Sequence, residues 1–499
     1  MRVLFLSLQG LSPVSQATES EIMKQRLDRG EEVWLLRCGA ALKTCRLNPT
    51  HNLLGCAICT HRCTSEALRM GVPEARILQL DESLFPEQLS EQLPEDLEGL
   101  LNYDVGGVNV GRGAASTTIS FLRDFNLKPR AEHRDMLELQ VRTAIGASEN
   151  YKRILDRVMP DEVVMYNGRH IQVFPMVDLC QKRGIAFRCF EFGSRVNRYH
   201  EFINTTPHSI ESRQATMREM WRAADPGERA QKASAWYKNK RNRLKTNDQV
   251  YTAGQDVGTL PPGFDASVHN VAIFNSSEDE MKTIREWKTD LFDSQNEAIR
   301  GVLEATREDA GLHFYLRVHP NLARVDNDQL RELLDWDYPH LTISPPDDEV
   351  DTYALVDAAD VVLTFGSSVG LEATYWGTPS VLYGKSFYEK MDVVYQPASL
   401  TELLALLRTP APPAKPKENA LPFAYYIDNY GTPFTYSRVE TANDVWIDGN
   451  HLGRFNFGTL RNFLSFLPRW KDWAAAHRIF MGRGLNLRDL VRVYAKKIS

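Results

Sequence analysis

Two short polar motifs follow apolar segments in the second half of the chain. A His-Pro pair follows HFYLRV, and a Ser-Ser pair follows DVVLTF and precedes a helical pattern. An imidazole can donate to a phosphate oxygen near neutral pH, and a helix N-terminus with hydroxyls favours an anion. The motif residues, with a glutamate that could reach a ribose diol, are His319, Pro320, Asn321, Gly366, Ser367, Ser368 and Glu372. Together they predict a phosphate-binding edge, although a strand-ending histidine and a capped helix are the simpler interpretations of each motif alone.

A second group of reactive residues lies near the N-terminus. Five of the seven cysteines fall between residues 38 and 63. The Cys-x2-Cys spacing is typical of a structural zinc site, and ligation by cysteines alone could equally hold an iron–sulfur cluster. The expected ligands are Cys38, Cys45, Cys56 and Cys59, with Cys63 as the alternate. Reduced thiols in a loop are the competing interpretation.

The elements that must position these residues alternate between strands and helices. In the first half, strands are expected at 2–8, 32–38, 76–80, 162–167 and 185–192, with helices at 18–30, 65–71, 135–158 and after residue 170. In the second half, strands are expected at 270–275, 313–319, 341–346, 360–365 and 379–384, with helices at 279–306, 327–335, 351–357 and from 368. Strands separated by helices favour parallel sheets covered on both faces.

The predicted fold class is therefore α/β, with two Rossmann-like, doubly wound domains facing each other and a C-terminal helical tail. The expected boundaries are 1–204 for the first domain, 205–268 for a helical connector, 269–409 for the second domain, and 410–499 for a Pro-rich linker and tail. Ligands of such sheets bind outside the carboxyl ends of the strands. Both motifs of the second domain are expected at that edge.

Composition and charge narrow the class of protein. The 499 residues are 43% hydrophobic and 25% charged, as in soluble globular proteins. A net charge of −6 argues against a nucleic-acid partner. No apolar run approaches the ~18 residues of a membrane span, which favours a cytoplasmic protein. The basic, aromatic segment 461–499 could contact the inner face of a membrane through Trp470, Trp473 and Phe480, or form a helix that packs back on the first domain.

Several segments resemble a known family. NVAIFNSSEDE (270–280), LRVHPN (316–321) and DTYALVDAADVVLTFGSSVGLEATYWGTPSVLYG (351–384) resemble the capsular polysaccharide biosynthesis glycosyltransferases of GT-B architecture. The His-Pro and Ser-Ser pairs also occur in bacterial sialyl- and Kdo-transferases. The resemblance is closest over 250–390, and 161–193 is similar to the amino-terminal domain of the family.

The resemblance implies a nucleotide-sugar donor and a glycan or lipid-linked glycan acceptor. His319, Ser367 and Ser368 would hold the donor phosphate, and Glu372 would bind the ribose. The relatives need no metal for catalysis, so no catalytic cofactor is expected. A nucleotide-sugar epimerase of the same architecture and a non-catalytic, metal-stabilised assembly component are the competing functions.

Transfer at an anomeric carbon also needs a base, which should come from a strand end of the first domain. Glu191 closes the segment IAFRCFEF and is the first candidate. His170 is the second candidate, and Asn167 and Arg169 are expected on the acceptor side. Glu191 could instead be a structural partner of Arg195 or Arg198.

Overall fold

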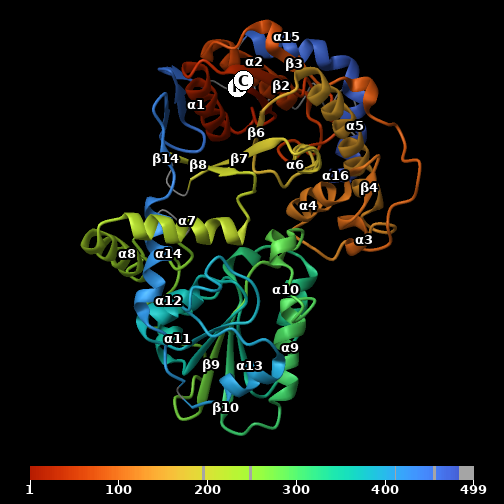
Figure 1. Cartoon of the computed structure of the whole chain (residues 1–499). Helices are drawn as coiled ribbons and strands as arrows, with labels where there is room; N and C mark the ends of the chain where they lie inside the picture. The colour runs from red at the N-terminus through yellow and green to blue at the C-terminus, as the bar shows by residue number, and fades with distance from the viewer. Residues whose placement is uncertain (194–196, 245, 247–249, 411, 453–456, 483–499) are drawn as a thin grey trace, which may run out of the picture. The chain divides into compact units, whose positions relative to one another are not determined.

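The computed structural model describes residues 1–193, 197–244, 246, 250–410, 412–452 and 457–482 (Figure 1). The chain divides into two compact units. The first unit comprises residues 1–122, 126–207 and 431 onward, and the second comprises 123–125 and 208–430. The segments 208–268 and 412–430, expected as connector and linker, therefore pack with the second unit.

The first unit is built on a seven-stranded sheet. Its strand order is β14-β8-β7-β6-β1-β2-β3, in which the five strands from β7 to β3 are parallel and β8 and β14 are antiparallel additions. The strands are β1 (Arg2–Ser7), β2 (Glu32–Arg37), β3 (Ile77–Gln79), β6 (Glu162–Tyr166), β7 (Ala186–Phe192), β8 (Arg198–Ile203) and β14 (Thr432–Pro433). The short strands β4 (Asp104–Val105) and β5 (Val108–Asn109) form a hairpin, and β15 (Ser437–Val439), β16 (Val445–Ile447) and β17 (Asn450–His451) form a three-stranded sheet.

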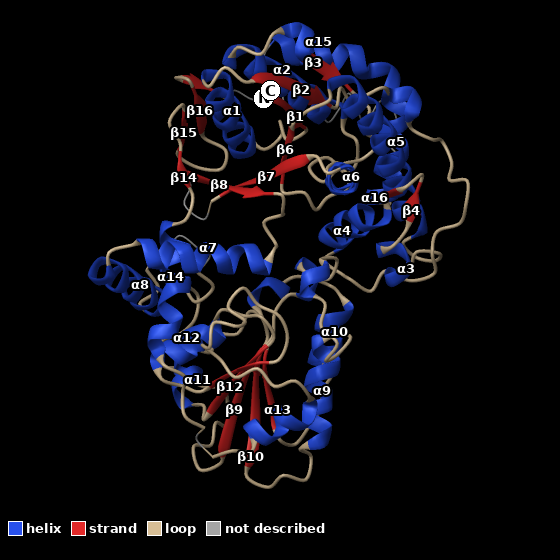
Figure 2. Cartoon of the chain, in the orientation of Figure 1, coloured by secondary structure: helices blue, strands red, loops and turns tan. Residues whose placement is uncertain are grey.

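Helices cover this sheet (Figure 2). They are α1 (Pro13–Asp28), α2 (Leu53–Met70), α3 (Leu97–Leu101), α4 (Gly111–Leu122), α5 (Arg134–Val158), α6 (Phe174–Arg183), α15 (Phe457–Phe466) and α16 (Trp470–Met481). Helix α15 packs on α2, and α16 packs on α5. The described part of the C-terminal tail therefore folds back on the first unit, whereas the rest of the basic segment 461–499 lies outside the described residues.

The second unit has a five-stranded parallel sheet of order β11-β10-β9-β12-β13. The strands are β9 (His269–Phe274), β10 (Leu312–Arg317), β11 (Leu341–Ser344), β12 (Val361–Thr364) and β13 (Ser380–Leu382). Alternate residues of β9 enter two different cores. Val271 and Ile273 pack on one face, and Ala272 and Phe274 pack on the other. Because both faces are buried, the strands are continuously apolar.

Eight α-helices of the described chain belong to this unit (Figure 1). They are α7 (Ile210–Ala223), α8 (Pro226–Arg241), α9 (Gln295–Ala305), α10 (Asp328–Leu334), α11 (Thr352–Ala358), α12 (Val369–Trp376), α13 (Leu400–Leu407) and α14 (Leu421–Asn429). Helices α9 and α13 contribute to the core on one face, and α11 and α12 contribute to the core on the other. The predicted fold class, with two Rossmann-like sheets and C-terminal helices, is confirmed.

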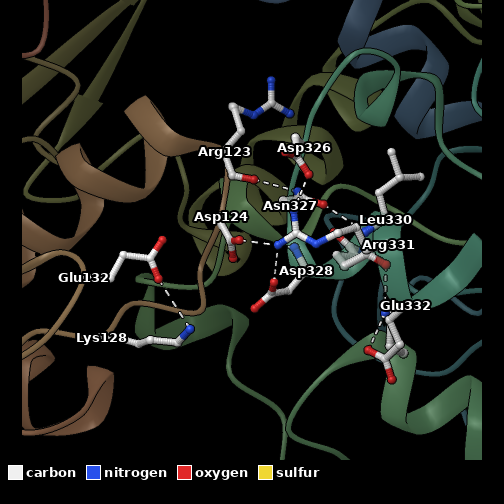
Figure 3. A network of polar contacts seen from close by, with 12 residues as sticks. Arg123, Asp124, Lys128, Glu132, Asp326, Asn327, Asp328, Leu330, Arg331 and Glu332 are labelled. Atoms are coloured by element: carbon white, nitrogen blue, oxygen red, sulfur yellow. Dashed lines mark hydrogen bonds and ion pairs between the residues drawn. The ribbon is translucent and has the colours of Figure 1, made fainter. Parts of the chain in front are cut away.

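The short segment 123–125 is anchored to the second unit at α10 (Figure 3). Asn327 caps this helix, because its Oδ1 accepts the N–H of Leu330 at 2.9 Å, and its Nδ2 donates to the carbonyl of Arg123 at 2.6 Å. The carboxylate of Asp124 accepts the N–H of Asp328 at 3.2 Å. These contacts place Arg123 beside the strand ends of the second unit.

Two expected helices were misplaced. The helix expected at 65–71 begins at Leu53, because the side chain of Asn52 caps it by accepting the N–H of Gly55. Half of the cysteine segment is therefore helical. The helix expected at 279–306 is confined to α9, because the hydroxyl of Ser294 accepts the N–H of Glu297 and starts a new helix there.

The expected membrane contacts of two aromatic residues were wrong. Trp473 and Phe480 are only 3% and 8% exposed, because they pack in the apolar clusters beneath α15 and α16. Among the described residues, no helix combines the length and the apolar character needed to cross a membrane.

Candidate functional site

A cavity of about 460 Å³ lies at the carboxyl ends of β9, β10 and β12 in the second unit. The strand order reverses between β9 and β12, since the chain leaves β9 toward β10 and β11 and later returns to the other side. A doubly wound sheet opens a crevice at such a reversal, and ligands bind there. The cavity is in the size range of small-molecule sites.

His319 lies at the end of β10 and lines this cavity. Its backbone N–H donates to Asn275 Oδ1 at 2.9 Å, and its Nδ1 accepts the N–H of Asn321 at 3.1 Å. Because Nδ1 is an acceptor, the neutral ring carries its proton on Nε2. Burial, followed by the charges of Arg317 and Arg123, lowers the pKa of His319 to about 4. The imidazole is therefore a neutral Nε2–H donor at pH 7.

The Ser-Ser motif forms the loop between β12 and α12. Gly366 has a φ of +132°, and a Cβ there would lie 2.9 Å from the carbonyl oxygen of Lys385. Only glycine fits this turn without strain. Tyr388 fixes the loop by donating its hydroxyl to the carbonyl of Ser367 at 2.5 Å. Ser367 and Ser368 consequently line the cavity at the N-terminus of α12.

Asn275, which the sequence analysis did not identify, completes this edge. It follows β9, is 1% exposed and lines the cavity. Its Oδ1 is bound by His319, but its Nδ2 has no hydrogen-bond partner among the described residues. Thr252 Oγ1 and Arg317 Nε also have no hydrogen-bond partner in the described part of the chain, and both residues line the cavity. Unpartnered buried polar groups are rare in proteins and mark places where a ligand or water belongs.

Glu372 also lines the cavity, but its carboxylate is already bound. It accepts from the hydroxyl of Tyr353 at 2.5 Å and from Ser368 at 2.8 Å, and it forms an ion pair with Lys240 at 3.1 Å. Lys240 belongs to α8, in the segment expected to be a connector. The structure thus brings Glu372 to the predicted edge of the sheet, in a network that local sequence patterns do not reveal.

Positive groups gather behind the cavity. Arg317 is 4% exposed, and its guanidinium donates to the carbonyls of Pro345 and Asp348 at 2.6 and 2.9 Å. These described hydrogen bonds go to backbone oxygens, so none of them pairs the positive charge with a carboxylate. Arg123 donates to Ser277 Oγ at 2.9 Å and pairs with Asp279 at 2.6 Å. An anion at this edge would therefore meet the charge of Arg317, whereas the charge of Arg123 is already paired with Asp279.

Aromatic side chains form another part of the cavity wall. Trp287 and Phe387 both line it, with their rings edge to face and 4.9 Å apart. Tyr251 contacts the ring of His319 edge to face at 5.2 Å. A cavity with polar donors at one edge and flat apolar walls suits a molecule that combines a phosphate with a planar ring.

The base candidates lie at the corresponding strand ends of the first unit. Glu191 accepts from the hydroxyl of Tyr166 at 2.5 Å and from Asn167 Nδ2 at 2.6 Å. Burial and the charge of Glu191 raise the pKa of Tyr166, which stays protonated. Arg169 donates to Ser120 Oγ at 3.2 Å, and His170 is buried. The structure brings Glu191 and Asn167 into contact; Arg195, a suggested partner of Glu191, lies outside the described residues.

The cysteines separate into two groups. Cys38, Cys45, Cys56 and Cys59 line one small cavity of about 30 Å³ in the first unit, and Cys63 is not among its lining residues. Cys63 is buried on α2, with its Sγ 3.5 Å from Gln16 Oε1. Within the described chain, no group of three or more His, Cys, Asp or Glu side chains is arranged to hold a metal ion.

Comparisons with known proteins found weak structural likeness. No protein-family model matches the chain, and no curated protein matches its sequence. Among solved structures, the β-Kdo 2,4-transferase KpsC of Thermosulfurimonas dismutans shares 15% identity over 53% of this chain and 79% of that chain, with a TM-score of 0.36. The 2,7-transferase of the same organism shares 13% identity over 64% and 89% of the two chains, with a TM-score of 0.33.

A UDP-GlcNAc 2-epimerase from Neisseria meningitidis, bound to UDP-GlcNAc, shares 10% identity over 94% of this chain and 100% of that chain, with a TM-score of 0.28. Scores this low carry no argument about what the chain does.

Proposed function

We propose that the chain is a glycosyltransferase whose second unit binds a nucleotide-sugar donor. The observation that carries this proposal is a set of buried polar atoms that lack a hydrogen-bond partner in the described chain and belong to cavity-lining residues, Thr252 Oγ1, Asn275 Nδ2 and Arg317 Nε. Each such group costs about 1–3 kcal/mol unless a ligand satisfies it. A phosphate offers the acceptor oxygens that these donors lack.

The donor phosphate would be held by groups from three strand ends. His319 Nε2–H and Asn275 Nδ2–H would donate to its oxygens, and the N-terminus of α12 would add backbone N–H groups and a favourable dipole. The ring of Trp287 or Phe387 would stack on the base. The same hydrogen bonds would help the nucleotide to leave, because they stabilise the negative charge that develops on its phosphate when the bond to the sugar breaks.

The reaction follows from this assignment. An acceptor hydroxyl attacks the anomeric carbon, the bond from that carbon to the phosphate oxygen breaks, and the electron pair leaves with the nucleotide. Glu191 is the proposed base that takes the hydroxyl proton, because it is a carboxylate oriented by two hydrogen bonds at a strand end of the first unit. Arg317 supplies a positive charge, His319 supplies a neutral N–H donor, and the helix terminus supplies a favourable dipole, so we propose that catalysis needs no divalent cation.

The experiment that tests this proposal is a donor panel. CMP-, UDP-, GDP- and dTDP-sugars would be incubated with the full chain, with and without a glycan acceptor, and released nucleotide would be measured. We expect release from one donor class that depends on the acceptor and persists in EDTA. Conversion of a donor without any acceptor would instead indicate an epimerase, and no reaction or binding with any donor would overturn the proposal.

His319→Ala sharpens the test. This change removes the Nε2 donor and should lower donor turnover by at least a hundredfold, while the circular dichroism spectrum stays unchanged. Activity close to wild type in this variant would remove His319 from the mechanism.

An exposed apolar strip on the first unit supports a lipid-linked acceptor. On α15, Phe457 and Leu464 are 81% and 55% exposed, and Leu460 lies between them on the same face. Trp470, the first residue of α16, is 37% exposed, and Arg461 on α15 is exposed as well. Aromatic and basic groups on one helical face suit an anionic membrane surface. This strip replaces the buried Trp473 and Phe480 as the proposed peripheral membrane contact.

Vesicle flotation tests the membrane contact. The full chain should float with vesicles that contain anionic phospholipid and should bind vesicles of neutral phosphatidylcholine less. The double variant Phe457→Ser, Leu464→Ser should lose this binding while it keeps acceptor-dependent activity on a soluble glycan. Equal flotation of the variant and the wild-type chain would exclude the strip as a membrane contact.

A further inference from the structure

The small cavity of the first unit brings together four cysteines that the proposed glycosyl transfer does not use. Cys38 and Cys45 belong to the loop between β2 and α2, whereas Cys56 and Cys59 are three residues apart on α2, on one helical face. The cavity volume, about 30 Å³, is roughly twice what one water needs. Four thiols thus surround one small space.

The loop is folded so that backbone N–H groups surround the sulfur atoms. Gly39 and Ala40 both have a φ of +61°, so the loop turns sharply directly after Cys38. Leu42 N–H donates to Cys38 Sγ at 3.4 Å, and Asn48 Nδ2 donates to Cys56 Sγ at 3.3 Å. Hydrogen bonds of this kind to sulfur are a feature of iron–sulfur sites.

A histidine, His51, lines the same cavity as the four cysteines. His51 is 1% exposed, and its Nε2 atom has no hydrogen-bond partner among the residues that the structure describes. Its φ of +51° lies in the left-handed region, which costs about 1–3 kcal/mol for a residue other than glycine. An unpartnered imidazole in a strained backbone conformation beside four thiols points to a missing group.

We propose that Cys38, Cys45, Cys56 and Cys59 bind a [4Fe–4S] cluster. Four cysteine thiolates are the ligand set of this cluster, and on binding each thiol loses its proton to solvent as an iron–sulfur bond forms. A single zinc ion is less suitable. Zinc bonds of about 2.3 Å would place the sulfur atoms roughly 3.8 Å apart around a single ion, whereas a cavity separates the four thiols here.

The cluster would connect the β2–α2 loop to α2 beneath α15. Ala40 and Ala57 pack here with Phe466 and Trp473 in one apolar cluster, which shields the site from water. This proposal is independent of sugar transfer, because its ligands lie in the first unit and contact none of the donor-binding residues.

Metal and sulfide analysis of the full chain tests the proposal. Protein purified without oxygen, or reconstituted with ferrous iron and sulfide, should contain about four iron atoms and four acid-labile sulfides per chain. It should also absorb broadly in the visible range and lose this absorption with dithionite. One zinc per chain without sulfide, or no metal after reconstitution, would overturn the proposal.

Cysteine variants locate the cluster. Cys45→Ser and Cys56→Ser should each lose most of the iron. Cys180→Ser is the matched control, since Cys180 is buried in the first unit and is not among the residues that line this cavity, and it should retain the iron. Iron loss in the control alone, or retention in both cavity variants, would contradict the assignment even if a variant were less stable.

Discussion

The two units place similar residues at equivalent strand ends, but they satisfy them differently. Both contain five parallel strands in the same order, β3-β2-β1-β6-β7 in the first and β11-β10-β9-β12-β13 in the second. In the first unit, Asn167 Nδ2 and the hydroxyl of Tyr166 both donate to Glu191. In the second, Asn275 Nδ2 is buried without a partner in the described chain.

In the first unit, a carboxylate is oriented by its neighbours. In the second unit, unpartnered donors line a cavity that can bind a ligand. Glu191 is held in one position, which suits a base that acts on a single proton. Asn275 Nδ2 and the other unpartnered donors can still form hydrogen bonds. Leaving them unpaired lowers the stability of the empty protein, and a bound ligand that accepts their hydrogen bonds would offset this cost. The predictions below test whether this contrast is functional.

The largest effect is expected from Glu191→Gln. The amide keeps the shape of the side chain but cannot accept a proton, so kcat should fall by about 10²- to 10⁴-fold. Nucleotide affinity should stay within about twofold, because Glu191 lies in the first unit. Steady-state kinetics and a separate binding titration measure the two quantities. A change in affinity with an unchanged kcat would reverse the roles of the two units.

Asn275→Asp should weaken nucleotide binding by more than about a hundredfold. The Oδ1 that accepts from His319 remains, but the unpartnered amide becomes a second oxygen that repels a phosphate, at several kcal/mol for like charges. Quenching of Trp287 fluorescence during nucleotide titration would report the affinity. Asn167→Asp is the matched control and should leave nucleotide affinity unchanged.

Gly366→Ala should reduce nucleotide affinity by about tenfold. The new Cβ would meet the carbonyl of Lys385 at 2.9 Å and requires a left-handed φ, which costs about 1–3 kcal/mol. The turn would shift Ser367 and Ser368 away from the phosphate. Gly377→Ala is a suitable control, since it has a positive φ but no atom within 4 Å of its added Cβ. If both variants bound alike, strain would have no specific effect on the site.

The smallest effect is a pH dependence of stability. The pKa of His319 is lowered to about 4 in the folded protein and is about 6.5 in an unfolded chain. Between these values the unfolded chain binds a proton that the folded chain excludes. Stability therefore falls as pH is lowered from 6.5 to 4, by at most about 3 kcal/mol from this group.

Chemical denaturation between pH 4.5 and 7 measures this dependence. Other groups titrate in the same range in both proteins, so the difference between wild type and His319→Gln isolates the contribution of His319. The variant should show the shallower dependence on pH. Identical pH profiles would mean that the His319 imidazole is accessible to solvent.

Local sequence patterns predict the sheets well and the site only in part. The β-branched segments that form β9, β10 and β12 bury both faces, so their periodicity and spacing identify the parallel sheet and place His319 and Ser367 at one edge. Asn275 follows β9 directly, and its strand-end position was the signal that could have identified it.

Other features depend on contacts that no local pattern contains. Lys240 reaches Glu372 across 132 residues, and the helical pattern around it resembles any solvated helix. The helix expected at 279–306 was placed by its apolar periodicity, but the hydroxyl of Ser294 caps a helix that begins only at Gln295. The spacing of Cys56 and Cys59 predicted that both side chains would face one site, but their position on α2 depends on the cap at Asn52.

A crystal structure of the full chain with a bound nucleotide diphosphate tests the central claim most directly. The account predicts phosphate oxygens within hydrogen-bond distance of His319 Nε2 and Asn275 Nδ2, with the base against Trp287 or Phe387. A nucleotide bound elsewhere, or an empty cavity at saturating nucleotide concentration, would contradict it.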